Sequence, residues 1–297
     1  MKFALTGNII DGTLVAAAVK ARIKVAVEKS KADGLIQPCL STVVVGNDPA
    51  SAIYVKNKQK AAADVGISTR DHKLKSDISQ SELLELIMKL NNDPEVHGIL
   101  VQLPLPNKID EYLITNAITP SKDVDGLTQT NAGMLLNGRA TLIPCTPLGI
   151  MELLNFYKIE LQSIDAVVVN RSNLVGKPLA LLLLQRNATV MICHSKSKNL
   201  VDKLRSAELI VTAVGNRQSF TLKSNMVQNG AVIIDVGITR FMGKPTGDVE
   251  DFASLKEKAS WITPVPGGVG PMTIAMLLNN TLLAASLCTD DIKNKHY

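Results

Sequence analysis

Three lysines lie within five residues in the stretch YVKNKQK, at positions 56, 58 and 60. The surrounding residues 49–65 carry the start and stop signals of a helix, which turns by about 100° per residue. On that helical wheel Lys58 shares a face with Tyr54 and with two apolar residues further on. The other two lysines point to the opposite side, so they are predicted to be solvated and Lys58 is predicted to face inward.

An inward-facing lysine is a candidate for proton transfer, because the loss of hydration lowers its pKa toward neutrality. Tyr54, one helical turn earlier, could donate or accept a hydrogen bond beside it. The alternative is a lysine whose stem is buried and whose amine reaches water. Wheel geometry alone favours this second interpretation without excluding the first.

Two further stretches carry polar groups where ligands could bind. VQLPLP, residues 101–106, is an apolar strand that ends in Gln102, and α/β proteins hold ligands at the carboxyl ends of parallel strands. The alternative is an amide that faces the loop. KDVDG, residues 122–126, packs two carboxylates into a turn that could hold a metal, cap a helix or bind an amino-substituted heterocycle. No neighbouring cluster of carboxylates or histidines supports a metal, so none is predicted.

A strand–loop–helix pattern in AVVVNRSNLVGKP, residues 166–178, is typical of dinucleotide binding, although GxGxxG is missing. One strand later, ATVMIC is followed by HSKSK, where an NAD-preferring domain would carry an acidic residue for the ribose. With Arg171 nearby, this cationic and hydroxyl-rich segment suits the 2′-phosphate of NADP. The alternative is a basic loop without a ligand. TPVPGGVGPMT, residues 263–273, adds three glycines, which let the backbone approach a ligand closely.

The length of 297 residues predicts two domains. The chain is 46% hydrophobic and only 3% aromatic, and its Ala, Val, Ile and Leu are typical of buried parallel strands and the helices that cover them. The net charge of +5 is spread along the chain, without basic runs interleaved with aromatics. Nucleic-acid binding is therefore unsupported, and an anionic small ligand fits the charge equally well.

The cysteines indicate a reducing compartment. Cys39, Cys145, Cys193 and Cys288 form neither a CxxC motif nor a Cys/His metal spacing, which predicts reduced thiols. The first residues, MKFALTGNII, are a poor signal peptide. Apolar runs such as LALLLL at 179–184 are far shorter than the ~20 residues of a membrane span. A soluble cytoplasmic protein that does not enter a membrane is expected.

Strands and helices are predicted to alternate, which indicates α/β units around a mostly parallel sheet. The predicted strands are 40–45, 98–102, 166–169, 189–193, 209–214, 232–236 and 260–263, and the predicted helices are 14–31, 49–65, 81–91, 147–156, 177–185, 222–228 and 271–287. Thr146 and Pro147 read as a helix cap and a first helical residue, which places the domain boundary there. The predicted domains are 1–146 and 147–270, and the last helix, within 271–297, is expected to pack back on the first domain.

Together these stretches resemble the bifunctional methylenetetrahydrofolate dehydrogenase/methenyltetrahydrofolate cyclohydrolase family. The match is carried, in the family's order, by YVKNKQKAAADVGI, GILVQLPLP, KDVDGL, PCTPLGI, RSNLVGKPLALLLL, ATVMICHSKS, GAVIIDVGI, GDV and TPVPGGVGPMT. The resemblance implies an N-terminal α/β catalytic domain that binds folate, a C-terminal Rossmann-type domain that binds NADP, and a cleft between them. It also implies a homodimer through the second domain. The implied reactions are oxidation of 5,10-methylenetetrahydrofolate with NADP and hydrolysis of the methenyl product to 10-formyltetrahydrofolate.

The resemblance also assigns roles to matching positions. Lys58 would be the general acid/base, with Gln102 bonded to it, Tyr54 stacked on or orienting the folate, and Asp125 holding the amino edge of the pterin. These are the catalytic residues, and the substrate-binding residues additionally include Leu103, Pro266 and Gly268. The cofactor-binding residues are Thr146, Arg171, Ser172, Ser195, Gly215, Ile238 and Thr273, with Arg171 and Ser195 at the 2′-phosphate.

Two positions depart from the family's pattern. Asn170 stands where the family usually has Gly before Arg-Ser, and Asn tolerates positive φ better than most residues, so the loop is expected to survive with a changed cofactor affinity. Arg217 stands where the family has Pro and could add a cationic contact to the cofactor.

Three other functions stay compatible with the sequence. A monofunctional dehydrogenase or cyclohydrolase is kept open by Asn170. A non-catalytic dinucleotide sensor would bind NADP but would have no reason to aim Lys58 at a ligand. A nucleic-acid-binding module rests on the net charge alone.

Overall fold

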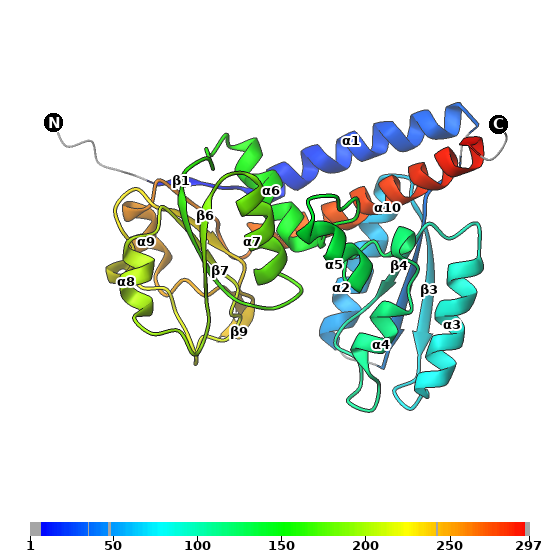
Figure 1. The fold of residues 1–297 in the computed structure, drawn as a ribbon, viewed down its shortest axis with the longest axis horizontal. Coiled ribbons are helices and arrows are strands. Elements are labelled where there is room, and N and C mark those ends of the chain that lie inside the picture. Colours follow the sequence, from blue (N-terminus) through cyan, green and yellow to red (C-terminus); the bar gives the residue numbers. More distant parts are fainter. Residues whose placement is uncertain (1–6, 35, 47–48, 242, 295–297) are drawn as a thin grey trace. The chain divides into compact units, whose positions relative to one another are not determined.

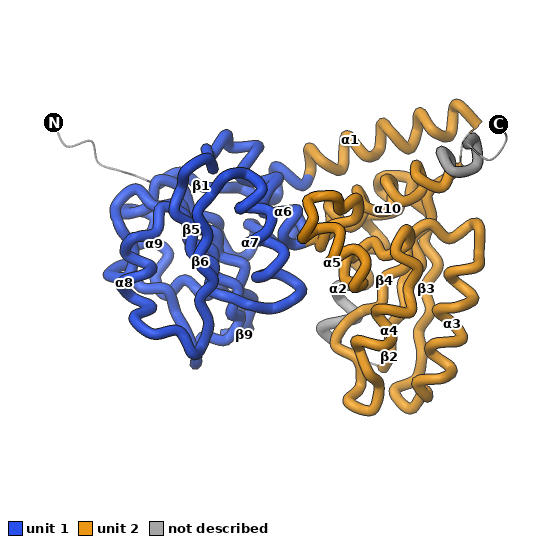
Figure 2. The backbone as a smooth tube through the Cα atoms, viewed as in Figure 1, with its two compact units in different colours: residues 1–16, 146–273 blue, residues 17–145, 274–297 orange. Residues whose placement is uncertain are grey.

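The structure is a computed structural model that describes residues 7–34, 36–46, 49–241 and 243–294, with their side chains except those of 49–54 and 289–294. Two compact units divide the chain, as Figure 2 shows: unit 1 joins residues 1–16 to 146–273, and unit 2 joins residues 17–145 to 274–297. Each unit is built around a parallel sheet, so the predicted two-domain α/β class is confirmed.

The sheet of unit 2 has three parallel strands in the order β3-β2-β4 (Figure 1). The strands are β2 (Cys39–Val45), β3 (Ser68–Leu74) and β4 (Gly98–Val101), and the crossover helices that parallel neighbours require are α2 (Pro49–Asp64) and α3 (Gln80–Asn92). Central β2 is mostly buried and apolar. Edge strand β3 has the polar sequence STRDHKL, which explains why it was not predicted.

One hydrophobic core cluster of unit 2 lies between this sheet and α3. Ser79 and Glu82 form a reciprocal capping box that starts α3, and the helix then turns Leu83, Ile87 and Leu90 inward. These residues pack with apolar side chains of β2 and β4 in one cluster. The other helices with residues in unit 2 are α1 (Gly12–Ala32), α4 (Glu111–Asn116), the 3₁₀ helix η1 (Pro120–Lys122), α5 (Gln129–Leu136) and α10 (Val269–Asn294).

The sheet of unit 1 has six strands in the order β1-β11-β8-β7-β5-β6, and all of its neighbours are parallel. Figure 1 labels β1, β6 and β7 of this sheet. The strands are β1 (Asn8–Ile9), β5 (Asp165–Val169), β6 (Thr189–Cys193), β7 (Leu209–Thr212), β8 (Val232–Asp235) and β11 (Trp261–Ile262). The other elements are α6 (Cys145–Phe156), α7 (Gly176–Gln185), α8 (Leu200–Arg205), η2 (Ser224–Met226), α9 (Phe252–Lys258) and an antiparallel hairpin of β9 (Thr239–Phe241) and β10 (Lys244–Thr246).

The order of these strands creates a topological switch point beside β5. The chain passes from β5 through α7 to β6 on one side, and then returns through α8 to β7 on the other side of β5. In a doubly wound sheet, ligands bind outside the carboxyl ends of the two strands where the order reverses. In this unit those strands are β5 and β7.

Several elements, among them β3, α4, α5, α8 and α9, were not predicted, and two further differences from the predictions involve distant segments of the chain. A helix at 222–228 was wrong: only η2 forms there, because the backbone of Leu222 bonds to Asp248 and Glu250 on a distant segment. In addition, β1 was not predicted and pairs with β11, and residues 1–16 group with unit 1. Both differences arise from pairing over long sequence separations, which local patterns do not report.

Helix α10 contains the stretch Val269–Cys288, whose 20 residues are long and apolar enough to cross a membrane by length and composition alone. The sequence interpretation overlooked it because polar residues interrupt the apolar run. Half of the stretch is buried inside the protein. Asn280 and Thr281 within it are fully buried and donate hydrogen bonds to main-chain carbonyls. These contacts are those of a core helix.

Candidate active site

Lys58 lies on α2 and directs its amine at the carboxyl end of β4. Its Nζ donates a hydrogen bond of 3.0 Å to Oε1 of Gln102. The Gln102 amide is oriented by its own Nε2, which donates to the carbonyl of Leu103 at 2.8 Å, so Oε1 is the atom left to face the lysine. Lys58 is half-buried, whereas Lys56 and Lys60 are exposed. The prediction that Lys58 alone of the three faces inward is therefore confirmed.

Lys58 belongs to a desolvated cluster of ionisable groups. Burial lowers the pKa of Lys58, and the neighbouring Asp125 and Cys145 oppose that fall. Burial also raises the pKa of Asp125, although the lysine opposes this shift. Burial, together with Asp125, raises the pKa of Cys145 well above its usual value, so its thiol stays protonated at neutral pH. The cluster thus combines an amine that can lose its proton with a carboxyl group and a neutral thiol.

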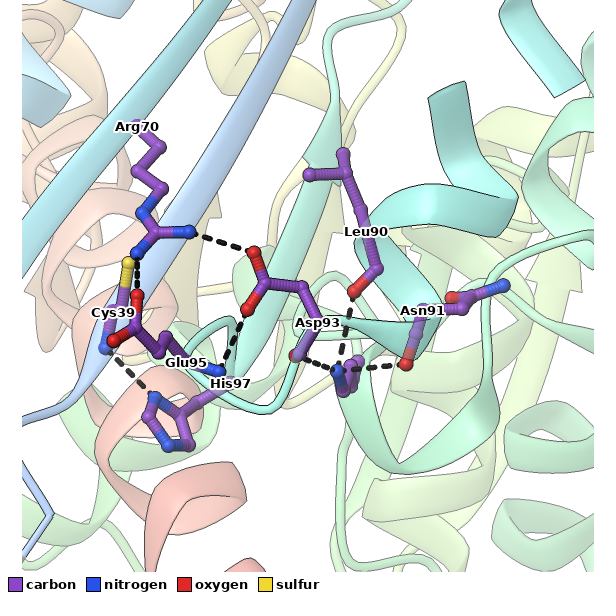
Figure 3. Close-up of polar contacts among 8 residues, drawn as sticks. Cys39, Arg70, Leu90, Asn91, Asp93, Glu95 and His97 are labelled. Carbon is purple, nitrogen blue, oxygen red and sulfur yellow. Dashed lines mark hydrogen bonds and ion pairs between the residues drawn. The ribbon is translucent and has the colours of Figure 1, made fainter. Parts of the chain in front are cut away.

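The KDVDG turn that carries Asp125 is anchored by its first residue. Lys122 is buried, and its Nζ donates to the carbonyls of Leu90, Asn91 and Asp93 at 3.2, 2.8 and 2.7 Å. Figure 3 shows these carbonyls converging at the end of α3, next to the ion pairs of Arg70. Lys122 therefore caps α3 and ties the turn to the end of that helix.

The two carboxylates of the turn have different environments. Asp123 accepts hydrogen bonds from the main-chain N–H of Thr128 at 2.8 Å and from Nδ2 of Asn131 at 2.9 Å, so it braces the start of α5. Asp125 is the carboxylate that interacts electrostatically with Lys58. Gly126 follows with φ of +68°, a conformation that favours glycine and lets the chain turn away.

Two residues that sequence reasoning did not place in the site support the backbone beside Asp125. Asn280 of α10 is fully buried and donates from Nδ2 to the carbonyls of Val124 at 2.8 Å and Ile143 at 2.9 Å. The Cys145 thiol donates to the same Val124 carbonyl at 3.3 Å. A polar Asn inside an apolar helix was the available signal for the first, and Cys145 was predicted only as a core thiol.

Other predicted members of this site are less defined. The side chain of Tyr54 lies outside the described residues, so its contact with folate stays a prediction. Leu103 is half-buried directly after Gln102. The structure thus brings together Lys58, Gln102 and Asp125, on three different elements of one unit.

In unit 1, the predicted cofactor residues gather at the carboxyl edge of the sheet. Ile238 follows β8, Gly215 follows β7, Arg171 and Ser172 follow β5, and Ser195 follows β6. These four strands are parallel neighbours in that order, so the loops after them line one edge across the switch point. All five residues are exposed or half-buried, which leaves their side chains or backbone open to a ligand.

The two residues predicted at the 2′-phosphate lie on adjoining loops. The last residues of β5 and β6 are paired in register, so Arg171 and Ser195 extend from neighbouring strand ends. Ser195 lies in a tight turn, in which the main-chain N–H of Ser197 donates to the His194 carbonyl at 2.8 Å. Exposed guanidinium and hydroxyl groups on adjoining loops suit phosphate oxygens.

Two buried carboxylates accept hydrogen bonds from main-chain N–H groups directly after β7 and β8. Asp248 is fully buried and accepts the main-chain N–H groups of Val214 at 2.7 Å and Gly215 at 2.9 Å. Asp235 accepts those of Gly237 at 3.1 Å and Asp248 at 2.9 Å. Burial raises the pKa of Asp235 to about 6, against the N–H groups that lower it. The sequence contained both residues in GAVIIDVGI and GDV but indicated no role for them.

The two departures from the family pattern have structural explanations. Asn170 does not adopt a positive φ, so the predicted reason for tolerating Asn at this position was wrong. Its side chain instead donates to the carbonyl of Ala213 after β7 and accepts the main-chain N–H of Ser172 in its own loop. The Arg217 guanidinium donates to the carbonyls of Gly247 at 2.7 Å and Val249 at 2.6 Å, and it lies 5.5 Å from the ring centroid of Phe241. Arg217 is therefore engaged within unit 1.

The remaining predicted residues also belong to unit 1. Pro266 is exposed, while Gly268 is buried and a Cβ there would lie 2.5 Å from the Pro264 carbonyl, so close packing alone requires glycine. The hydroxyls of Thr146 and Thr273 are hydrogen-bonded at 3.0 Å. Helix α6 begins at Cys145, so Thr146 lies in its first turn and not before it as a cap. The substrate and cofactor roles of these residues stay predictions.

Known proteins resemble both parts of the chain. Residues 144–289 match the family model of the tetrahydrofolate dehydrogenase/cyclohydrolase NAD(P)-binding domain, and residues 10–125 match that of the catalytic domain. The chain is 56% identical over 283 residues to the bifunctional protein FolD of Nitrosopumilus maritimus, which covers 95% of this chain and 98% of that protein.

Solved structures agree with these matches. The bifunctional FolD methylenetetrahydrofolate dehydrogenase/cyclohydrolase of Campylobacter jejuni is 48% identical, with a TM-score of 0.91 over 94% of this chain and 99% of that one. The methylenetetrahydrofolate dehydrogenase-cyclohydrolase of Trypanosoma brucei, solved with NADP cofactor and an inhibitor, is 34% identical, with a TM-score of 0.89 over 95% and 98%.

Proposed function

Because the chain belongs to the tetrahydrofolate dehydrogenase/cyclohydrolase family, we propose that it oxidises 5,10-methylenetetrahydrofolate with NADP⁺ and hydrolyses the methenyl product to 10-formyltetrahydrofolate. The observation that carries the proposal is the cluster of Lys58, Gln102 and Asp125. Hydrolysis needs a group that accepts and returns a proton, and burial shifts the pKa of the half-buried Lys58 downward, the direction that favours its neutral, proton-accepting form.

The oxidation depends on alignment more than on acid or base chemistry. NADP⁺, when bound, supplies the acceptor for the hydride that leaves the methylene carbon. The groups of this chain that would hold it lie at the carboxyl edge of unit 1, with Arg171 and Ser195 at the 2′-phosphate and Gly215 offering exposed backbone at the switch point. Asp125 would accept a hydrogen bond from the pterin amino group and so orient the folate.

The hydrolysis uses Lys58 directly. The oxygen of a water molecule bonds to the methenyl carbon, and the neutral amine of Lys58 accepts the released proton. Oε1 of Gln102 accepts a hydrogen bond from the resulting ammonium group, as it does from Nζ in the structure. The bond from this carbon to N5 then breaks, and its electron pair and a proton returned by Lys58 go to N5. The hydroxyl group on the carbon loses its remaining proton to solvent and becomes the carbonyl of the formyl group, which stays on N10.

A spectrophotometric assay of the purified chain with methylenetetrahydrofolate tests both activities, with NADP⁺ and NAD⁺ compared. Reduction of NADP⁺ without accumulating methenyl absorbance is expected. Reduction of NAD⁺ alone would retain the enzyme class and contradict the 2′-phosphate site. Accumulation of the methenyl product would contradict the cyclohydrolase, and no reduction with either cofactor would contradict the dehydrogenase.

A homodimer through unit 1 is part of the proposal. Strand β6 is at one end of the six-stranded sheet, and its Met191 and Ile192 are 42% and 39% exposed. An edge strand with exposed apolar side chains is a template for pairing with a second chain. Light scattering should give twice the monomer mass, and Met191→Lys should shift the protein toward the monomer. A wild-type monomer at micromolar concentration would contradict the dimer.

The expected setting is the cytoplasm. The described cysteines are all free thiols, which suits a reducing compartment. There the product would donate its formyl group to purine biosynthesis. Fractionation of cells that express the tagged chain tests the location, and a membrane-bound pool would contradict it.

A further inference from the structure

The side chain of Asn170 joins two of the loops that are proposed to bind the cofactor. Its Nδ2 donates to the carbonyl of Ala213, just after β7, at 2.6 Å. Its Oδ1 accepts the main-chain N–H of Ser172 at 2.7 Å and that of Gly176, the first residue of α7, at 3.2 Å. One amide therefore links the end of β5, the loop after it, the start of α7 and the turn after β7.

This amide lies at the switch point of the sheet, because β5 and β7 are the neighbours between which the strand order reverses. The close contact between α7 and Asn170 requires glycine at position 176. A Cβ on Gly176 would lie 2.2 Å from the main-chain oxygen of Asn170 and 2.7 Å from its Oδ1. Glycine therefore permits α7 to begin directly against the Asn170 amide.

The turn after β7 is held from a second side. Asp248 accepts the N–H groups of Val214 and Gly215, while Asn170 donates to the preceding carbonyl of Ala213. Side chains therefore form hydrogen bonds with main-chain groups of three successive residues, the Ala213 carbonyl and the N–H groups of Val214 and Gly215. These residues follow the last residue of β7. Gly215 in this turn has φ of +63°, so the turn has a specific shape to maintain.

We propose that Asn170 is a positioning residue for NADP: its amide sets the spacing between the β5 loop, which presents Arg171 and Ser172, and the β7 turn, which presents Gly215. The proposal rests on the NADP binding proposed above. A residue that only stabilised the fold would affect both activities alike. A positioning residue affects cofactor binding and leaves the hydrolysis, which uses Lys58 and no cofactor, at its normal rate.

The test compares wild type with Asn170→Ala, Asn170→Asp and the matched control Asn173→Ala. Asn173 lies in the same loop, and its Oδ1 accepts from the exposed Lys177 Nζ. Asn170→Ala is expected to raise the KM and Kd for NADP about tenfold, as for the loss of one net hydrogen bond. Asn170→Asp keeps the acceptor atoms but turns an oxygen toward the Ala213 carbonyl, so its KM is expected to rise further.

In Asn170→Ala and Asn170→Asp, kcat at saturating NADP and the rate of hydrolysis of added methenyltetrahydrofolate are expected to match those of wild type. For the control Asn173→Ala, the KM and Kd for NADP, kcat and the hydrolysis rate are all expected to match those of wild type. The positioning role is overturned if NADP binds the Asn170 variants as tightly as wild type, or if hydrolysis and NADP reduction fall together. If wild type itself binds no NADP in a direct titration, the proposed function and this inference both fall. If wild type and variants bind equally, only the inference falls.

Discussion

Two lysines of unit 2 both have pKa values lowered by burial, but their surroundings differ. Lys122 donates to three main-chain carbonyls at the end of α3, which uses all the protons of its ammonium group. Among the described residues, Lys58 donates to one amide oxygen, and it interacts with the ionisable Asp125 and Cys145. Burial alone therefore does not identify a proton-transfer group. Free donor capacity separates Lys58 from Lys122, because Lys122 also has the ionisable neighbours Cys288 and Asp93.

The same criterion applies to buried carboxylates in unit 1. Asp235 has a pKa raised to about 6, a value often associated with catalysis. Its oxygens, however, accept main-chain N–H groups from Gly237, Asp248 and Val249. By the criterion that separates the two lysines, Asp235 is a structural group despite its pKa.

The largest effect is expected from Lys58→Met. General acid–base catalysis contributes about 100- to 10,000-fold, so hydrolysis of methenyltetrahydrofolate should fall by that factor while some dehydrogenase activity is retained. Lys60→Met, on the opposite face of α2, is the control and should hydrolyse normally. Normal hydrolysis by the Lys58 variant would remove the distinction between the two lysines.

Lys122→Met should act on stability. Three carbonyls lose their donor, so the free energy of unfolding should fall by about 2–4 kcal/mol in urea denaturation, while the folded variant keeps its hydrolysis rate. A Lys122→Met variant with unchanged stability and no hydrolysis would contradict the distinction between Lys122 and Lys58.

Asp125→Asn should sharpen the account of Lys58. The carboxylate raises the lysine pKa against the effect of burial, so its removal should lower that pKa further. Hydrolysis that requires the neutral amine rises with pH through this pKa. The acidic limb of the pH profile should therefore move to lower pH, and a shift to higher pH would contradict the assignment of the base.

Asp235→Asn should change how stability depends on pH. A carboxyl group whose pKa rises on folding binds more protons when folded, so its contribution to stability is greatest below the unfolded pKa of 3.8 and is lost as pH rises toward 6. The variant should lack this decline, which is on the order of 1 kcal/mol per pH unit. The prediction would be contradicted if the free energy of unfolding changed by the same amount in wild type and in the variant between pH 4 and pH 6.

The elements that the sequence predicted best are those with a local cause. Central strands such as β2 and β5 are mostly buried and mostly apolar, and Lys58 faces inward because helical periodicity places it there. The polar edge strand β3 and the two-residue β1 have no such pattern and form only because a neighbour pairs with them. The helix expected at 222–228 failed for the same reason, since Leu222 pairs with a distant segment.

By itself, the sequence determined the alternation of strands and helices, the cationic loops at the ends of β5 and β6, and the identity of Lys58, Gln102 and Asp125 as candidates. Only the tertiary structure decided which charges are committed to the fold. No local pattern shows that Lys122, Asp235 and Asp248 are committed to the fold, because their partners are main-chain groups of distant segments. The proposed role of Asn170 likewise depends on the tertiary structure, because β7 ends beside it and its amide can donate to the Ala213 carbonyl. A side chain's capacity for chemistry therefore depends on which of its polar atoms already form hydrogen bonds within the fold.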